Sequence, residues 1–242
     1  MPRKPRQLEV GKIYHIINRG VEKRSIFLKP QDYSRFILGL EFFNSDGSFH
    51  LWDMLARPHA IRAGTVPALA QRIESMRQKP RGRIVDLLGF ALMPNHYHFI
   101  LREITEGGIS RFMRKLGGYS MYFNKQYKRI GPLFQSRYRA IPINSDEQLA
   151  AIFAYVHTNP IELTESGWKK RKVNDPVRAL AALENYKWSS YRDYIGVPTF
   201  SQTIQTEFFT NFYGNQGKCR QAIKDWVAYK AAISQPNLET ME

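Results

Sequence analysis

Hydrophobic and polar positions alternate along this chain with two different periods, and these periods predict strands and helices in turn. Short apolar runs bounded by turn residues, as strands are, cover four segments: 13–19, 83–92, 96–102 and 133–143. Apolar residues at helical spacing cover three more segments: 30–43, 109–125 and 145–159. The last of these helices begins with Ser145 and Gln148 in a capping-box arrangement and is stopped by Pro160.

The predicted order is strand, helix, strand, strand, helix, strand, followed by a helix. This order is typical of a split βαβ, or ferredoxin-like, antiparallel sheet, so we predict an α+β fold with one added helix. Residues 44–82 interrupt the pattern and are interpreted as an insertion. We therefore expect one domain over residues 8–165 and a basic C-terminal extension over 166–242, with helices near 176–184 and 216–233.

Composition narrows the class of partner. The chain has 242 residues, of which 43% are apolar, so it is long and apolar enough to form a real core. Lys and Arg number 36 against 21 acidic residues, and a net charge of +15 favours a polyanion, with nucleic acid as the leading candidate. No run of 18 apolar residues predicts a membrane span, and no lipidation signal is present. The single cysteine, Cys219, and the lack of an apolar segment after the basic start indicate the cytoplasm.

The segment His96-Tyr97-His98 brings candidate chemistry to one predicted strand. Alternate residues of a strand share a face, so His96 and His98 point the same way and could bind one divalent metal ion. The competing interpretation, commoner for an isolated pair, is that these imidazoles form hydrogen bonds within the fold. His15 has no histidine at a matching spacing, and we interpret it as structural or exposed.

Tyr155 and Asn159 supply what the histidine pair lacks. They lie four residues apart on a predicted helix and therefore on one side of it, although Pro160 disfavours α geometry at Asn159 and predicts a distorted last turn. The Tyr155 hydroxyl could attack a phosphate, while Asn159 offers an oxygen as a third metal ligand. Two imidazoles and an amide oxygen are a neutral set that suits Mg²⁺ or Mn²⁺, although affinity alone favours Zn²⁺.

Several alternatives stay open for these side chains. Tyr155 could be a partly buried helix tyrosine with no chemical role. Three rival nucleophiles lie on the preceding predicted helix: Tyr119, Tyr122 and Tyr127. His157 lies two residues from Tyr155 and faces elsewhere on a helix, so we do not count it as a ligand.

Basic residues form the candidate DNA-binding set. Three arginines lie on or just after predicted strands and are interleaved with aromatic residues, as in proteins that bind phosphates and unstacked bases: Arg19, Arg137 and Arg139. Three more cations share the polar face of one predicted helix and could steer DNA electrostatically: Arg111, Arg114 and Lys115. The run 169–172 is a further phosphate-facing candidate. For any one of these residues the alternative is an ordinary solvated basic surface.

Five blocks of sequence follow one another along the chain: Asn18-Arg19-Gly20, Leu92-Met-Pro-Asn-His-Tyr-His98, Gly131-Pro-Leu-Phe-Gln-Ser-Arg-Tyr138, Tyr155-Val-His-Thr-Asn-Pro160 and Trp188-Ser-Ser-Tyr191. In their order and spacing these blocks resemble the REP-associated tyrosine transposases, IS200-like members of the single-tyrosine HUH transposase superfamily. The resemblance covers about residues 10–195.

The resemblance implies a ferredoxin-like fold, His96 and His98 as metal ligands and Tyr155 as the nucleophile that forms a 5′-phosphotyrosine bond and leaves a free 3′-OH. Asn159 falls where some relatives have glutamine as the third ligand, and Gln135 joins the DNA-binding candidates. The implied substrate is single-stranded DNA beside a short hairpin, such as a REP-like palindrome. The insertion is longer than this family leads us to expect, and both monomer and homodimer stay open.

Two other functions compete with a metal-dependent single-stranded DNA endonuclease and strand transferase. The first is a non-catalytic hairpin DNA-binding protein on the same fold, against which the intact set of His96, His98 and Tyr155 argues. The second is a zinc hydrolase built on the two histidines. That enzyme needs a strong third ligand and an acidic general base, and the motif provides neither.

Overall fold

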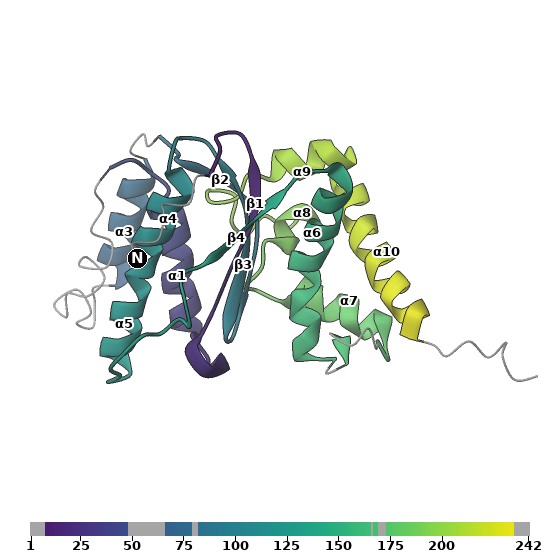
Figure 1. Ribbon diagram of the computed structural model, residues 1–242, viewed down its shortest axis with the longest axis horizontal. Coiled ribbons are helices and arrows are strands. Elements are labelled where there is room, and N and C mark those ends of the chain that lie inside the picture. Colours follow the sequence, from purple (N-terminus) through teal and green to yellow (C-terminus); the bar gives the residue numbers. More distant parts are fainter. Residues whose placement is uncertain (1–7, 48–65, 79–81, 166, 169–172, 235–242) are drawn as a thin grey trace, which may run out of the picture.

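A four-stranded antiparallel sheet forms the centre of the molecule (Figure 1). The structure is a computed structural model that describes residues 8–47, 66–78, 82–165, 167–168 and 173–234. The strands, in spatial order, are β2 (Val85–Met93), β3 (His96–Glu103), β1 (Ile13–Arg19) and β4 (Arg139–Ile143). All three neighbouring pairs are antiparallel, which confirms the predicted α+β, ferredoxin-like arrangement.

Helices cover both faces of the sheet (Figure 1). One layer contains α1 (Pro30–Phe42), α3 (Val66–Arg77), α4 (Gly108–Gly117) and α5 (Tyr119–Gln126). The other contains α6 (Asp146–Thr158), α7 (Pro176–Asn185), α8 (Tyr191–Tyr194), α9 (Thr206–Tyr213) and α10 (Gln216–Ser234). Within the described residues the chain also forms two 3₁₀ helices, η1 (Val21–Lys23) after β1 and η3 (Asn159–Leu163) after α6. Among the described residues, none of these helices has the length and apolar character needed to cross a membrane.

Alternation along β3 separates a packing face from a chemical face. Tyr97 and Phe99 point into the first helical layer, where both rings contact Phe36 of α1. Because neighbouring residues of a strand point to opposite faces, His96 and His98 face the second layer. On that side Phe153 of α6 packs against Tyr194 and Phe209 of the C-terminal region, so the extension packs against α6.

Three details differ from the sequence predictions. The fourth strand is shorter than 133–143, because residues 133–138 follow β1 only through the isolated bridge between Gly20 and Phe134. The helix predicted over 109–125 is two helices, since the glycine pair at 117–118 weakens helix formation at that point. Asn159 itself has α geometry, with φ −52° and ψ −38°, although Pro160 follows it. The departure from ideal helix geometry falls one residue earlier, at Thr158 with φ −94° and ψ −5°, and the chain continues as the 3₁₀ helix η3, in whose first turn Pro160 needs no N–H donor.

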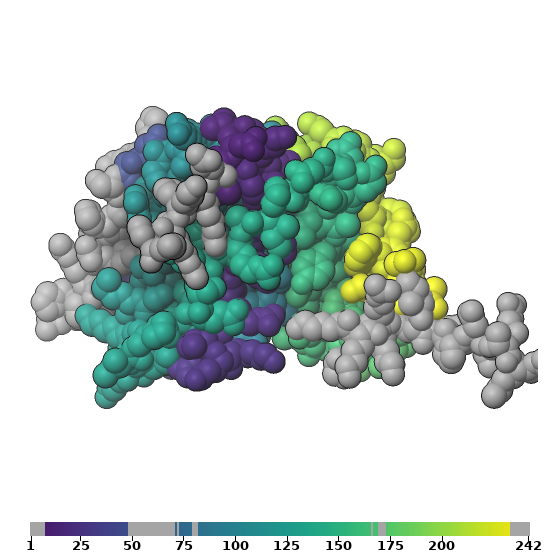
Figure 2. Space-filling model, viewed as in Figure 1, coloured from purple at the N-terminus to yellow at the C-terminus, as the bar shows by residue number. Residues whose placement is uncertain are grey.

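The segment before β4 lies beside the loop that follows β1. Val21 donates its backbone N–H to the Leu133 carbonyl at 2.9 Å, and Gln135 donates to the Arg19 carbonyl at 3.0 Å. The two segments are neighbours on the molecular surface, purple beside teal at the lower edge of Figure 2. Residues 133–138 therefore border the end of the sheet at which His96 lies.

Candidate active site

The chemical face of the sheet gathers two histidines and two arginines. In the register of β1 with β3, Arg19 is opposite His96 and Ile17 is opposite His98. In the register of β1 with β4, Ile17 is opposite Arg139. Directly paired residues of antiparallel strands share a face, so these four side chains lie together on the face that α6 covers.

Tyr155 is presented to this face by α6. Its ring meets the His98 ring edge-on, with centroids 5.3 Å apart and planes at 85°. His98 is fully buried, whereas 38% of Tyr155 is exposed, so the tyrosine contacts the histidine and also reaches solvent. The structure therefore brings together the two residues that the sequence placed on separate elements.

Asn159 follows Tyr155 by one helical turn, as the spacing predicts. Its backbone N–H donates to the Tyr155 carbonyl, and its side-chain Nδ2 donates to the same oxygen at 3.3 Å. With Nδ2 held by this hydrogen bond, Oδ1 of the buried amide is the atom that could bind a cation.

Each histidine of the pair has a polar partner at its Nδ1 atom. Nδ1 of His98 lies 2.9 Å from Nε2 of His15, and Nδ1 of His96 lies 2.6 Å from Oδ1 of Asn95. His15 is buried, and burial together with the charge of Arg139 lowers its pKa to about 4, so it is neutral at pH 7. The sequence prediction overlooked the contribution of His15, because the pairing of β1 with β3 is what brings it to His98.

The donor set fits a divalent cation bound by few protein ligands. The His96 and His98 ring centroids are 4.9 Å apart. No group of three His, Cys, Asp or Glu residues is placed to bind a metal ion anywhere in the described part of the chain. An ion at this pair would therefore be completed by an amide oxygen, water or substrate, which are the ligands Mg²⁺ and Mn²⁺ accept.

Residues 60–159 match the model of a protein family described as transposase IS200 like. The matched segment contains both histidines, Tyr155 and Asn159. The resemblance inferred from the motifs is confirmed over this segment. A solved structure described as "Structure of the REP associates tyrosine transposase bound to a REP hairpin" is similar to the chain, with a TM-score of 0.47 and 15% identity over 85% of this chain and 93% of that chain. No curated protein matches the chain.

The Trp188–Tyr191 block of the IS200-like pattern supports α6 rather than contacting the histidine pair. His157 of α6 is buried, with Nδ1 beside the Phe153 carbonyl at 2.9 Å and Nε2 beside Oγ of Ser190 at 2.8 Å. Ser190 in turn accepts the Phe90 N–H of β2, and Leu92 donates to the Trp188 carbonyl. His157 thus connects the tyrosine helix to the sheet edge, which agrees with our interpretation that it faces away from His96 and His98.

The rival tyrosines are engaged in the opposite layer. Tyr119 donates its hydroxyl to the Ile26 carbonyl at 2.6 Å. Tyr122 and Tyr127 donate to the two carboxylate oxygens of buried Asp32 at 2.9 and 2.7 Å. Burial and the Asp32 carboxylate raise the pKa of Tyr122 to about 12, which makes it a poor nucleophile. These hydroxyls bond to Ile26 and to Asp32 of α1, in the helical layer on the far side of the sheet from His98.

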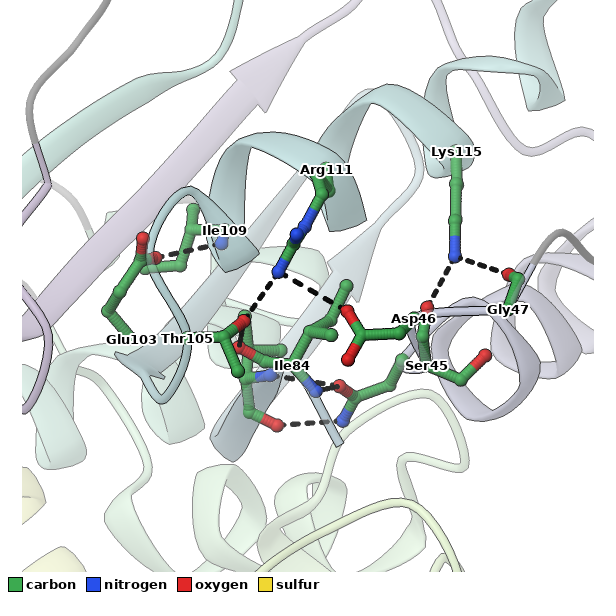
Figure 3. A network of polar contacts seen from close by, with 11 residues as sticks. Ser45, Asp46, Gly47, Ile84, Glu103, Thr105, Ile109, Arg111 and Lys115 are labelled. Atoms are coloured by element: carbon green, nitrogen blue, oxygen red, sulfur yellow. Dashed lines mark hydrogen bonds and ion pairs between the residues drawn. The ribbon is translucent and has the colours of Figure 1, made fainter. Parts of the chain in front are cut away.

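Arg111 and Lys115 also lie in that opposite layer, where they hold the start of the insertion (Figure 3). Arg111 donates to Oγ1 of Thr105 at 2.6 Å and pairs with Asp46 at 3.3 Å. Lys115 donates to the carbonyls of Ser45 and Gly47. Arg114, on the same helix, is exposed. The sheet therefore separates this cationic group from Tyr155.

The remaining DNA-binding candidates border the histidine end of the sheet. Gln135 and Arg137 are exposed, and their segment lies beside Arg19 because the Gln135 N–H donates to the Arg19 carbonyl. Arg139 begins β4 and is exposed as well. The basic run 169–172, like the histidines at positions 50 and 59, lies outside the described residues.

Proposed function

We propose that this chain is a metal-dependent single-stranded DNA endonuclease and strand transferase, a transposase that cleaves DNA beside a hairpin through a 5′-phosphotyrosine intermediate. The contact of Tyr155 with His98, on a face shared with His96 and two arginines, carries the proposal. The match of residues 60–159 to IS200-like transposases supports the same reaction class.

The reaction assigned to Tyr155 is transesterification. Its hydroxyl oxygen attacks the phosphorus, a bond from phosphorus to the tyrosine oxygen forms, and the bond from phosphorus to the 3′ oxygen breaks. The tyrosine proton is lost and the departing strand gains one as its free 3′-OH. The 3′-OH of a second strand can attack the phosphotyrosine bond in reverse, which releases the tyrosine and joins DNA without ATP.

His96, His98 and Asn159 would hold the divalent ion, Mg²⁺ or Mn²⁺. When bound, such an ion neutralises charge on the phosphoryl oxygens and orients the phosphorus for in-line attack. The side chains fit this role because both imidazoles have Nδ1 engaged by a neighbour, so Nε2 is the nitrogen through which each would bind.

Two arginines would fix the DNA backbone at the histidine pair. Nε of Arg19 is buried and has no hydrogen-bond partner within the part of the chain described, and a DNA phosphate would supply one. Arg139 lies across β1 from His98 and is exposed to a ligand. Gln135 and Arg137 would extend this surface along the DNA. We expect REP-like hairpins as substrate and a cytoplasmic protein that acts as a monomer or a homodimer.

Substitution of Tyr155 tests the proposal directly. Tyr155→Phe removes the attacking oxygen, so we expect no SDS-resistant adduct with a labelled hairpin oligonucleotide, while binding of the same oligonucleotide stays within about twofold. Tyr122→Phe is the matched control and should keep the adduct, because that hydroxyl is bound to Asp32 in the opposite layer. An adduct that persists in Tyr155→Phe would assign the attack to another residue.

Removal of divalent ions tests the role of the histidine pair. EDTA should abolish cleavage and leave hairpin binding intact, and added Mn²⁺ should restore cleavage. Cleavage that survives complete chelation contradicts a metal role for His96 and His98. A wild-type protein that binds the hairpin but forms no adduct with any divalent ion is instead the non-catalytic DNA-binding protein.

A further inference from the structure

His15 contacts the histidine pair from the neighbouring strand. It is opposite Ile100 in the β1–β3 register, and Ile17 is opposite His98, so His15 and His98 are diagonal neighbours on one face. Both are buried, and Nε2 of His15 lies 2.9 Å from Nδ1 of His98.

The two rings meet edge to edge rather than face to face. Their planes differ by only 14°, yet their centroids are 5.1 Å apart while the facing nitrogens are at hydrogen-bond distance. Two rings joined in this way are nearly coplanar, which directs one hydrogen atom along the line between the two nitrogens. The contact is therefore a well-aligned hydrogen bond, and it sets the orientation of the His98 ring.

In His96, the other histidine of the pair, the hydrogen-bond partner identifies Nδ1 as the donor. Nδ2 of Asn95 donates to the Lys23 carbonyl at 3.1 Å, so the amide oxygen is the atom that faces His96. An oxygen accepts only, and Nδ1 of His96 must therefore carry the proton. The second nitrogen of a neutral imidazole then has a lone pair and can bind a cation.

We propose that His15 is a positioning residue for His98: its Nε2 accepts a hydrogen bond from Nδ1 of His98, which leaves Nε2 of His98 without a proton and able to bind the same divalent cation as Nε2 of His96. The inference rests on the proposed metal-dependent function. It gives each metal-binding histidine one acceptor, Asn95 for His96 and His15 for His98. Acceptors of this kind set ring orientation and ligand basicity, and their loss typically weakens metal binding by about 10- to 100-fold.

Two substitutions of similar size separate a hydrogen-bonding role from a packing role. His15→Gln keeps an acceptor oxygen near the position of Nε2, whereas His15→Leu removes the acceptor. We expect the Mn²⁺ dissociation constant, measured by titration of the protein alone, to rise by about 10- to 100-fold in His15→Leu and by less than about threefold in His15→Gln. Equal losses in both variants would assign His15 a packing role, and a wild-type value in His15→Leu would overturn the proposal.

His157→Gln is the matched control. His157 is equally buried and is also hydrogen-bonded, but to Phe153 and Ser190. This variant should lose thermal stability while its Mn²⁺ affinity stays within about twofold of wild type. A loss as large as that of His15→Leu would show that any damage to a buried histidine on this face disturbs the metal site, and would contradict a specific role for His15.

The protonated nitrogen can also be observed without metal. Long-range ¹H–¹⁵N correlation spectra of the metal-free protein at pH 7.5, labelled on histidine, should show His98 protonated on Nδ1. Protonation on Nε2 of His98 overturns the proposal, whatever the enzyme does. If the spectra and the Mn²⁺ titrations agree with the proposal but Tyr155→Phe keeps its adduct, the proposed nucleophile fails and the role of His15 stands. A wild-type protein that binds no Mn²⁺ refutes both.

Discussion

At the scale of single residues, the end of β1 depends on a position where no side chain fits. Gly20 has ordinary extended geometry, with φ −60° and ψ 142°, so its backbone conformation does not require glycine. The lack of space requires glycine, because a Cβ atom there would lie 2.2 Å from the Arg24 carbonyl oxygen. Gly20 also donates its N–H to the Asn95 carbonyl at 2.8 Å. The glycine thus joins Arg19 to the turn that holds His96.

Gly20→Ala should therefore destabilise the protein and disturb the site. We expect a loss of about 1–3 kcal/mol in the free energy of unfolding, because backbone atoms must move to admit the methyl group. Cleavage should fall as Asn95 shifts away from His96. Urea unfolding followed by circular dichroism measures the stability.

Gly117→Ala is the control for this substitution. A Cβ atom at Gly117 meets nothing within 4 Å, and alanine favours the helix, so this variant should be as stable as wild type or more stable by up to about 1 kcal/mol. A Gly20→Ala protein with wild-type stability would show that the Arg24 carbonyl moves aside freely.

At the scale of elements, periodicity predicted what depends on a single segment. The alternation 96, 98 placed two histidines on one face, and the four-residue spacing placed Asn159 one turn beyond Tyr155, as the structure has them. Properties that depend on two segments were out of reach. The contact of His15 with His98 needs the strand register, and β4 is short because its continuous pairing with β1 begins only at Arg139, beyond the isolated bridge at Phe134.

The helix that carries Arg111 and Lys115 shows the same limit. Its apolar stripe predicts which side of the helix faces the core. The stripe does not predict which face of the sheet the helix covers, and α4 covers the face opposite α6 (Figure 1). Steering of DNA toward Tyr155 by these two cations therefore stays a prediction that the placement of α4 does not favour.

Salt dependence of hairpin binding tests this separation. A phosphate contact releases about one counterion, so Arg139→Gln should reduce the slope of log affinity against log salt by about one. Arg111→Gln should change the slope by less than half as much, because Arg111 pairs with Asp46 and Thr105 inside the other layer. Fluorescence anisotropy at four or five salt concentrations gives both slopes. A larger effect at Arg111 would place the DNA on the α4 side.

At the scale of the whole molecule, α6, which carries Tyr155, packs against both the sheet and the C-terminal region. On its inner side, a Cβ atom at Gly89 of β2 would lie 3.4 Å from Cε1 of His157, so α6 approaches the sheet closely. One turn before His157, and in contact with its ring, Phe153 packs against Tyr194, Phe209 and Tyr213 of the C-terminal region. Tyr155 thus lies on a helix that the sheet and the C-terminal region both hold in place, and not on a free arm.

Hydrogen exchange should reveal whether α6 opens alone. Buried helices held on two sides exchange their amides only through large unfolding events, so α6 should be protected nearly as well as β3 in the wild-type protein. Phe209→Ala removes a fully buried ring that packs against Phe153 of α6, which should cost about 3–5 kcal/mol and speed exchange in α6 more than in β1 or β3. Tyr229→Ala, at a residue that is 59% exposed on α10, should leave the free energy of unfolding and the exchange rates in α6 unchanged.

If α6 exchanges far faster than β3 already in the wild-type protein, the helix opens independently of the sheet. The observed contact of Tyr155 with His98 would then be one of several positions that the nucleophile occupies.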